Sequence, residues 1–147
     1  MKKKIIYFCI LLGMLTMISG CKKTENDDVV TLKFMHRWTM EPMKSATETM
    51  IKKFEEENSD IKIEVLTATN SSYKQKIKTV INSEDAPDVF CTWGDEYLNK
   101  FVREGLVLDL TDFLKESGTM DSLVESQMTA FQYEGRYYGI PLKVDAK

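Results

Sequence analysis

The sequence predicts an α/β domain built on a mostly parallel sheet with flanking helices. Short runs of strand-type residues alternate with longer amphipathic segments between residues 29 and 105, and turn or capping residues separate them. Strands that alternate with helices in this way usually lie parallel, because each helix provides the crossover to the next strand. We therefore expect residues 29–147 to form one α/β domain.

The first strand and helix are predicted within residues 29–59. Val, Leu and Phe in the run 29–35 favour a strand that is buried on at least one face. Pro42 suits the start of a helix, and Asn58 and Ser59 end it. Because apolar residues recur at helical spacing, we expect one stripe of this helix to face the core. The stripe comprises Met43, Ala46, Met50, Ile51 and Phe54.

Two further strands follow, each with its own helix. Apolar and charged residues alternate over residues 61–65, which predicts a strand with one wetter face. Ser71 and Ser72 are placed to cap the next helix. A third strand is expected at residues 88–91, and the helix after it ends at Gly105. The inner stripes are Tyr73, Ile77, Val80 and Ile81 in one helix and Tyr97, Leu98, Phe101 and Val102 in the other.

The remaining residues predict smaller elements. Alternating leucines over residues 106–110 indicate a short extended piece, and residues 111–116 suit a small helix. Apolar residues at helical spacing predict another helix over residues 120–130. A two-residue Glu-Gly turn divides residues 131–140 into two strand-like runs, which predicts a hairpin.

The first 20 residues have the layout of an export signal. Three lysines precede an uncharged apolar run over residues 5–18, which is shorter than the roughly 20 residues needed to span a bilayer. The run closes with Ile18, Ser19, Gly20 and Cys21, which resembles the lipobox of bacterial lipoproteins. This resemblance implies that Cys21 is the first mature residue and carries the lipid. The alternative is an ordinary secretory signal followed by a chance cysteine.

A lipid on Cys21 would hold the protein at the cell membrane, on its extracytoplasmic face. Stable attachment needs more than one acyl chain, and lipoproteins carry several on this cysteine. Residues 22–28 are all polar or charged and predict a flexible tether. Whether the anchored face is a periplasm or the open exterior stays undecided. Cys91 is then the one thiol of residues 22–147, and its strand position favours a small buried hydrophobe.

Charge and residue content argue against several function classes. The formal charge is −3, and loss of the three signal lysines lowers it to −6, whereas nucleic-acid binding selects clustered Lys and Arg. His36 is the one histidine, which disfavours a metal site built from several imidazoles. The sequence holds no nucleophile elbow, zinc-protease motif or phosphate loop. We expect no catalytic residue, no metal and no cofactor.

Candidate ligand residues follow the predicted strands, because ligands of open α/β sheets bind beyond the carboxyl ends of the strands. His36 and Trp38 follow the first strand, and Thr92, Trp93 and Asp95 follow the third. Indole rings can stack on the C–H faces of a sugar while short polar and acidic side chains bond its hydroxyls. A tryptophan at a strand end is more often part of the core, but two of them on adjacent loops favour a sugar site.

Two ordered motifs give the sequence a family resemblance. The run from Ala86 to Phe90, with Trp93, Tyr97 and the Gly-Leu and Leu-Asp-Leu residues of 105–110, resembles a segment of the extracellular solute-binding proteins of sugar-type ABC importers. Residues 133–142 read YEGRYYGIPL, which is similar to the hairpin that leads toward the second lobe in that family. The resemblance runs from about residue 29 to the end of the sequence.

This resemblance implies the first lobe of a bilobed, periplasmic-binding-protein-like clamp that closes on a solute and presents it to a membrane permease. Residues 29–147 would form that lobe, and we expect the second lobe to lie outside these 147 residues. The implied partners are a carbohydrate or similar polar solute and the ABC permease subunits, and no enzymatic activity is implied. By matching positions, the ligand residues would be His36, Trp38, Thr92, Trp93, Asp95 and, where maltose-type members place an acidic sugar contact, Asp145.

Alternatives stay open for two residues and for the function. Asp95 is equally suited to cap the helix that follows it, and His36 to an ordinary loop contact. A cell-surface lipoprotein with a glycan-hydrolysing or scaffold role is the second functional hypothesis. Hydrolysis would need a carboxylate pair across a cleft, and no such pair stands out in the sequence.

Overall fold

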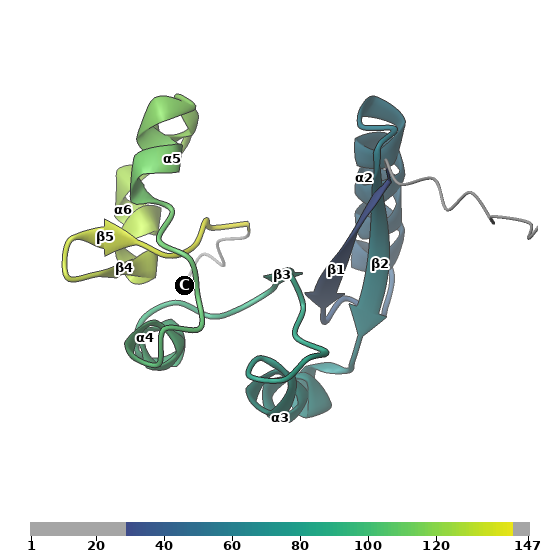
Figure 1. The fold of residues 1–147 in the computed structure, drawn as a ribbon, viewed down its shortest axis with the longest axis horizontal. Helices are drawn as coiled ribbons and strands as arrows, with labels where there is room; N and C mark the ends of the chain where they lie inside the picture. Colours follow the sequence, from purple (N-terminus) through teal and green to yellow (C-terminus); the bar gives the residue numbers. More distant parts are fainter. Residues whose placement is uncertain (1–28, 143–147) are drawn as a thin grey trace, which may run out of the picture.

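A three-stranded parallel sheet forms the first part of the fold in a computed structural model that describes residues 29–142 (Figure 1). The strands are β1 (Val30–His36), β2 (Ile61–Thr67) and β3 (Val89–Phe90), in the spatial order β2-β1-β3. β1 pairs with β2 along its whole length, from Val30 opposite Ile61 to His36 opposite Thr67. The predicted parallel sheet is confirmed, although its third strand is shorter than expected.

Two helices provide the crossovers between these strands. α2 (Met43–Glu57) connects β1 to β2, and α3 (Asn70–Val80) connects β2 to β3. The cap predicted at Ser71 and Ser72 is wrong, because α3 already begins at Asn70 with Thr69 before it. The Thr69 hydroxyl instead shares a hydrogen bond of 2.8 Å with the Ser72 hydroxyl. Ser72 therefore lies inside the first turn and does not precede it.

The inner stripe of α2 differs from the prediction. Met50 and Phe54 are exposed, at 48% and 39%, whereas Thr47 is buried. A threonine can face the interior here because its hydroxyl donates to the Met43 carbonyl at 2.8 Å, which satisfies the polar group within the helix. The more buried stripe follows Met43, Thr47 and Ile51 at i, i+4 spacing.

The main core lies between β1, α3 and α4 (Glu96–Arg103). Met35, Tyr73 and Ile77 have no exposed surface, and Phe101 of α4 is buried against them. Side chains alternate along a strand, so Met35 faces this core while the next residue, His36, points to the other face of the sheet. The inner stripes predicted for α3 and α4 are confirmed.

Tyr73 ties the carboxyl ends of two strands to α3. Its hydroxyl lies 2.9 Å from the Met35 carbonyl oxygen and 2.7 Å from that of Cys91, and it donates its one hydrogen between them. Burial raises the pKa of Tyr73, so the hydroxyl stays a donor at neutral pH. This bond fixes the spacing of the two loops that follow β1 and β3.

We expect Tyr73→Phe to lower the free energy of unfolding of the full-length protein by about 1–2 kcal/mol, because a buried hydrogen bond is lost. Tyr97→Phe is the matched control, since the Tyr97 hydroxyl donates to the Lys74 carbonyl at 3.3 Å in an exposed position. Urea denaturation followed by circular dichroism measures both variants. Equal losses at the two positions would contradict this role of Tyr73.

The second part of the fold contains short helices and a hairpin. α5 (Thr111–Glu116) forms as predicted, and β4 (Gln132–Tyr133) pairs with β5 (Arg136–Tyr137) in an antiparallel hairpin. The turn residues Glu134 and Gly135 have positive φ angles of 49° and 79°, as a two-residue hairpin turn requires. In Figure 1 these elements lie on the side of α4, away from α2 and β2.

The helix predicted over residues 120–130 is wrong. The segment instead forms η2 (Thr119–Ser122), α6 (Glu125–Met128) and η3 (Thr129–Phe131). Leu123 and Val124 between them are extended, with ψ angles of 146° and 115°. Two local causes favour this break: Val124 is β-branched, and the Ser122 hydroxyl closes the first turn by donating to the Thr119 carbonyl at 2.7 Å. Residues 106–110, which were predicted to be a short extended piece, form neither a helix nor a strand.

Three sequence predictions fall outside the described residues. They are the export signal of residues 1–20, the lipidated tether that begins at Cys21, and the ligand contact at Asp145. Between residues 29 and 142, no helix combines the length and the apolar character that crossing a bilayer requires.

Candidate ligand-binding site

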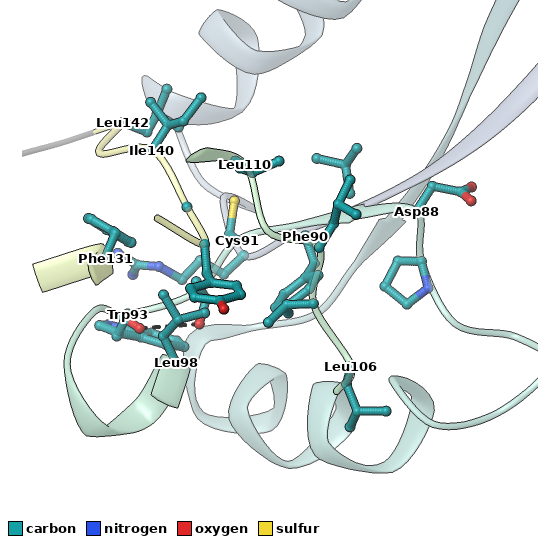
Figure 2. A pocket seen from close by; sticks show the side chains of 18 of the residues that line it. Asp88, Phe90, Cys91, Trp93, Leu98, Leu106, Leu110, Phe131, Ile140 and Leu142 are labelled. Atoms are coloured by element: carbon teal, nitrogen blue, oxygen red, sulfur yellow. Dashed lines mark hydrogen bonds between the residues drawn. The ribbon is translucent and has the colours of Figure 1, made fainter. Parts of the chain in front are cut away.

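A cavity of about 620 Å³ opens along β3 and the loop that follows it (Figure 2). One wall comes from the loops after β1 and β3, and it includes Arg37, Trp38, Thr92 and Trp93. The other walls are apolar and come from α4, the irregular residues 106–110 and the end of the hairpin. They include Leu98, Leu106, Leu110, Phe131, Ile140 and Leu142.

The structure brings three of the predicted ligand residues to one place. Trp38 follows β1, and Thr92 and Trp93 follow β3, which pairs directly with β1. Because parallel strands end at the same edge of a sheet, their loops meet there. The expectation that the two tryptophans lie on adjacent loops is therefore confirmed, while their contact with a ligand stays a prediction.

Trp93 is held by rings at its edges and by cations above its face. Tyr73 and Tyr97 pack against it in edge-on geometry, with ring centroids 6.0 Å and 5.2 Å away. Lys74 Nζ lies 4.4 Å from the centroid of the indole ring, and Arg37 Cζ lies 5.2 Å from it. The half-buried indole thus belongs to the margin of the core and also lines the cavity, so both interpretations of this tryptophan describe part of its environment.

His36 supports the first loop from inside. It is 4% exposed and does not line the cavity. Its Nδ1 accepts a hydrogen bond of 3.2 Å from the Trp38 backbone N–H, and the two rings stack with centroids 5.5 Å apart. The structure thus places His36 where it can position Trp38, whereas direct ligand contact is not apparent from the geometry.

The pKa of His36 is lowered from its usual 6.5 by burial, against a smaller opposing effect of the Glu48 charge. Below about pH 6.5 the unfolded chain takes up a proton that the folded imidazole resists, so this residue makes stability fall as pH falls. We expect His36→Asn, which keeps an acceptor for the Trp38 N–H, to reduce that slope. Melting temperatures of both proteins between about pH 7.5 and about pH 5.5 measure it. If the melting temperature of His36→Asn fell with pH as steeply as that of the unchanged protein, His36 would not be the source of this pH dependence.

Asp95 is the N-cap residue of α4 by position only. Its side chain makes no capping hydrogen bond and is exposed, and its φ of 55° is unusual for a residue other than glycine. Its backbone N–H donates to the Ala130 carbonyl at 2.6 Å, which docks the loop onto the segment before the hairpin. Asp95 does not line the cavity, so its ligand contact stays a prediction.

Cys91 is half-buried, less than its strand position predicted, and it lines the cavity. Burial raises the pKa of its thiol to about 11, against a weaker effect of Arg37, so the thiol is protonated at neutral pH. Among the residues that the structure describes, no group of His, Cys, Asp and Glu side chains could hold a metal ion.

Sequence reasoning missed Arg37, which lines the cavity, and Lys74, which lies over Trp93 but does not itself line the cavity. Arg37 stands in the loop between two predicted ligand residues, and Lys74 lies one turn into α3. Arg37 could have been predicted from its position directly after the first strand. The position of Lys74 over Trp93 depends on how α3 packs, which no local pattern shows.

Comparison with known proteins agrees with this fold. A family model described as bacterial extracellular solute-binding protein matches residues 38–146. Among curated proteins, none matches the chain. A solved structure from work on xylan utilisation by the thermophilic bacterium Caldanaerobius polysaccharolyticus is 37% identical, with a TM-score of 0.72 over 76% of this chain and 28% of that chain.

Two further solved structures show the same architecture. An ABC substrate-binding protein from Listeria monocytogenes in complex with cycloalternan is 28% identical, with a TM-score of 0.66 over 76% of this chain and 28% of that chain. The galacto-N-biose and lacto-N-biose I-binding protein of an ABC transporter from Bifidobacterium longum is 22% identical, with a TM-score of 0.65 over 80% of this chain and 29% of that chain.

The chain therefore spans less than a third of the length of these structures. Its parallel sheet and flanking helices have the periplasmic-binding-protein-like fold, as predicted. The family model covers most of the sequence, and one solved relative exceeds a third in sequence identity. The chain belongs to the family of bacterial extracellular solute-binding proteins.

Proposed function

We propose that this protein captures an extracellular carbohydrate, or a related polar solute, and delivers it to the permease of an ABC importer. The observation that carries the proposal is the meeting of Trp38 and Trp93 on one wall of a cavity beside a parallel sheet. Family membership supports it, as does the cycloalternan bound by the similar protein from Listeria monocytogenes. Residues 29–147 would form the first lobe of a two-lobed clamp.

The wall offers the groups that a saccharide needs. The Trp38 indole can stack on a C–H face of the sugar, and the Trp93 indole can contact it at the edge of the ring. The Thr92 hydroxyl and the Arg37 guanidinium can bond its hydroxyls. Apolar walls on the opposite side exclude water from a bound ring. These groups bind and orient a ligand without converting it, so we propose a non-enzymatic role.

A thermal-shift screen of the full-length protein against neutral and acidic mono- and oligosaccharides tests this function. A ligand present at 100 times its dissociation constant should stabilise the protein by about 2.7 kcal/mol. At least one saccharide should therefore raise the melting temperature. If no saccharide or other small polar solute stabilises the protein, the proposed function is wrong.

We also propose that a lipid on Cys21 anchors the protein, with residues 22–28 as the tether to the binding domain. Such an anchor keeps the binding domain near the permease at high effective concentration. Cells that express Cys21→Ser should show no labelling by radioactive palmitate and should release the protein from the membrane. Continued labelling of this variant would disprove lipid attachment at Cys21.

A further inference from the structure

Three basic side chains lie over the rings of Trp93 and Tyr97, and of these residues Arg37 and Trp93 line the cavity. Lys74 Nζ is 4.4 Å from the Trp93 centroid and 5.6 Å from that of Tyr97. Arg37 Cζ is 5.2 Å from the Trp93 centroid, and Lys78 Nζ is 5.7 Å from the Tyr97 centroid. Lys74 and Lys78 lie one turn apart on α3, so they share a face of that helix. We call Arg37, Lys74 and Lys78 the basic cluster.

The basic cluster lacks an acidic partner within residues 29–142. None of its three side chains forms an ion pair there, although ion pairs occur at many other basic residues of the described chain. Glu96, at the start of α4, pairs with Arg103. In a chain whose formal charge is −3, this is a local excess of positive charge next to a cavity wall. Arg37 Cζ and Lys74 Nζ lie 5.2 Å and 4.4 Å from the same ring centroid. Like charges repel, so an anion that contacts both groups would relieve that cost.

The cluster also retains unused hydrogen-bond donors. Arg37 Nη1 donates to the Asn70 side-chain oxygen at 3.2 Å, which orients the guanidinium and leaves most of its N–H groups available. The Lys74 ammonium group carries three more donors. A carboxylate that reaches both groups would accept charge-assisted hydrogen bonds, which are stronger than bonds between neutral groups.

A neutral sugar fits this surface less well. To stack on a face of Trp93 that already lies under Lys74 or Arg37, its C–H groups must displace a cation from the ring. That displacement forfeits a cation–π interaction. An acidic sugar instead adds an ionic contact and leaves the cation–π contacts intact.

We propose that the basic cluster selects a saccharide with an anionic group, which binds Arg37 and Lys74 at the rim of Trp93. A uronic acid carboxylate and a sugar phosphate share the required chemistry. The inference rests on the proposed function and narrows it from saccharides in general to acidic ones.

The test compares matched ligands on full-length protein. Calorimetry would use a panel in which each neutral mono- or oligosaccharide is paired with its uronic acid form, together with glucose 6-phosphate to separate phosphate from carboxylate. Arg37→Met and Lys74→Met remove the charges but keep an apolar side chain to cover the ring. Lys76→Met is the matched control, because Lys76 is on the same helix and no contact places it over either ring.

An acidic saccharide should bind more tightly than its neutral partner, and raised salt should weaken that preference. Each cluster variant should lose about tenfold or more in affinity for the acidic ligand, while Lys76→Met binds normally. Neutral saccharides that bind as tightly as acidic ones, or a preference that survives both cluster variants, would overturn this inference and leave the proposed function standing. Binding of no acidic member of the panel would also overturn this inference, whereas the proposed function is decided by the separate thermal-shift screen.

Discussion

Trp93→Ala is expected to reduce saccharide affinity of the full-length protein by about 30-fold or more, equivalent to about 2 kcal/mol, which is typical of a tryptophan anchor. The ring lies between the loop after β1 and the aromatic residues of α3 and α4, where it contacts Tyr73 and Tyr97 and lines the cavity. Its removal therefore takes away ligand contact and also loosens the arrangement of Arg37 and Lys74. Calorimetry with the saccharide found by the thermal screen measures the loss.

Two variants separate ligand contact from a general loss of structure. Trp93→Phe keeps an aromatic ring against Tyr73 and Tyr97, so it should fold with near-normal stability and bind with intermediate affinity. Trp38→Ala removes the second indole, whose ring stacks on His36 and lies outside the main core. It should weaken binding with little change in melting temperature. Normal affinity in both Trp93→Ala and Trp38→Ala would contradict the assignment of this wall as the ligand site.

Gly94→Ala is expected to be the most damaging small substitution in the described chain. A Cβ atom at Gly94 would lie 2.5 Å from the Ala130 carbonyl oxygen and 2.7 Å from the Ala130 Cβ. Backbone must move to relieve such contacts, and overpacking of this kind costs about 1–3 kcal/mol. The same movement would strain the bond from the Asp95 N–H to that carbonyl, so the loop that carries Trp93 should shift and saccharide affinity should fall as well.

Gly139→Ala provides the comparison for Gly94→Ala. Its Cβ would approach the Phe131 ring at 2.8 Å, but a side chain can turn aside where a backbone carbonyl cannot. We expect Gly139→Ala to lose less stability than Gly94→Ala, as measured by urea denaturation of both variants. A larger loss at Gly139 would show that contact between the 92–95 loop and Ala130 does not control the fold here.

Most of the parallel sheet could be predicted from the sequence, because strand and helix periodicities differ and each element carries a clear pattern. The hairpin was also predictable, since a Glu-Gly turn favours positive φ at both central positions. The predictions failed for the inner stripe of α2 and for residues 120–130, where the observed structure departs from the helical spacing of apolar residues. Thr47 is buried whereas Phe54 is 39% exposed, and a hydrogen bond within the helix satisfies the Thr47 hydroxyl there. Residues 120–130 bend at Leu123 and Val124 despite helical spacing.

The candidate site was predictable at the level of loops but less so for individual side chains. Strand ends identified Trp38, Thr92 and Trp93, which do meet at the cavity. Alternation along β1 places His36 on the opposite face of the sheet from Met35, where it is also buried, and no motif marks that burial. The cations over Trp93, Lys74 and Arg37, stand 19 and 56 residues before it in the sequence. Their positions depend on how α3 and the loop after β1 pack, so no local pattern shows them.

The central claim is that a saccharide binds at the wall formed by Trp38 and Trp93. Hydroxyl-radical footprinting of the full-length protein, with and without the stabilising saccharide, tests it most directly because it reports the accessibility of individual side chains. Phe113 of α5 is 64% exposed and does not line the cavity, so it serves as the internal control. Saccharide should reduce oxidation of both tryptophans and leave Phe113 unchanged. Unaltered oxidation of Trp38 and Trp93 in the saturated complex would contradict the claim.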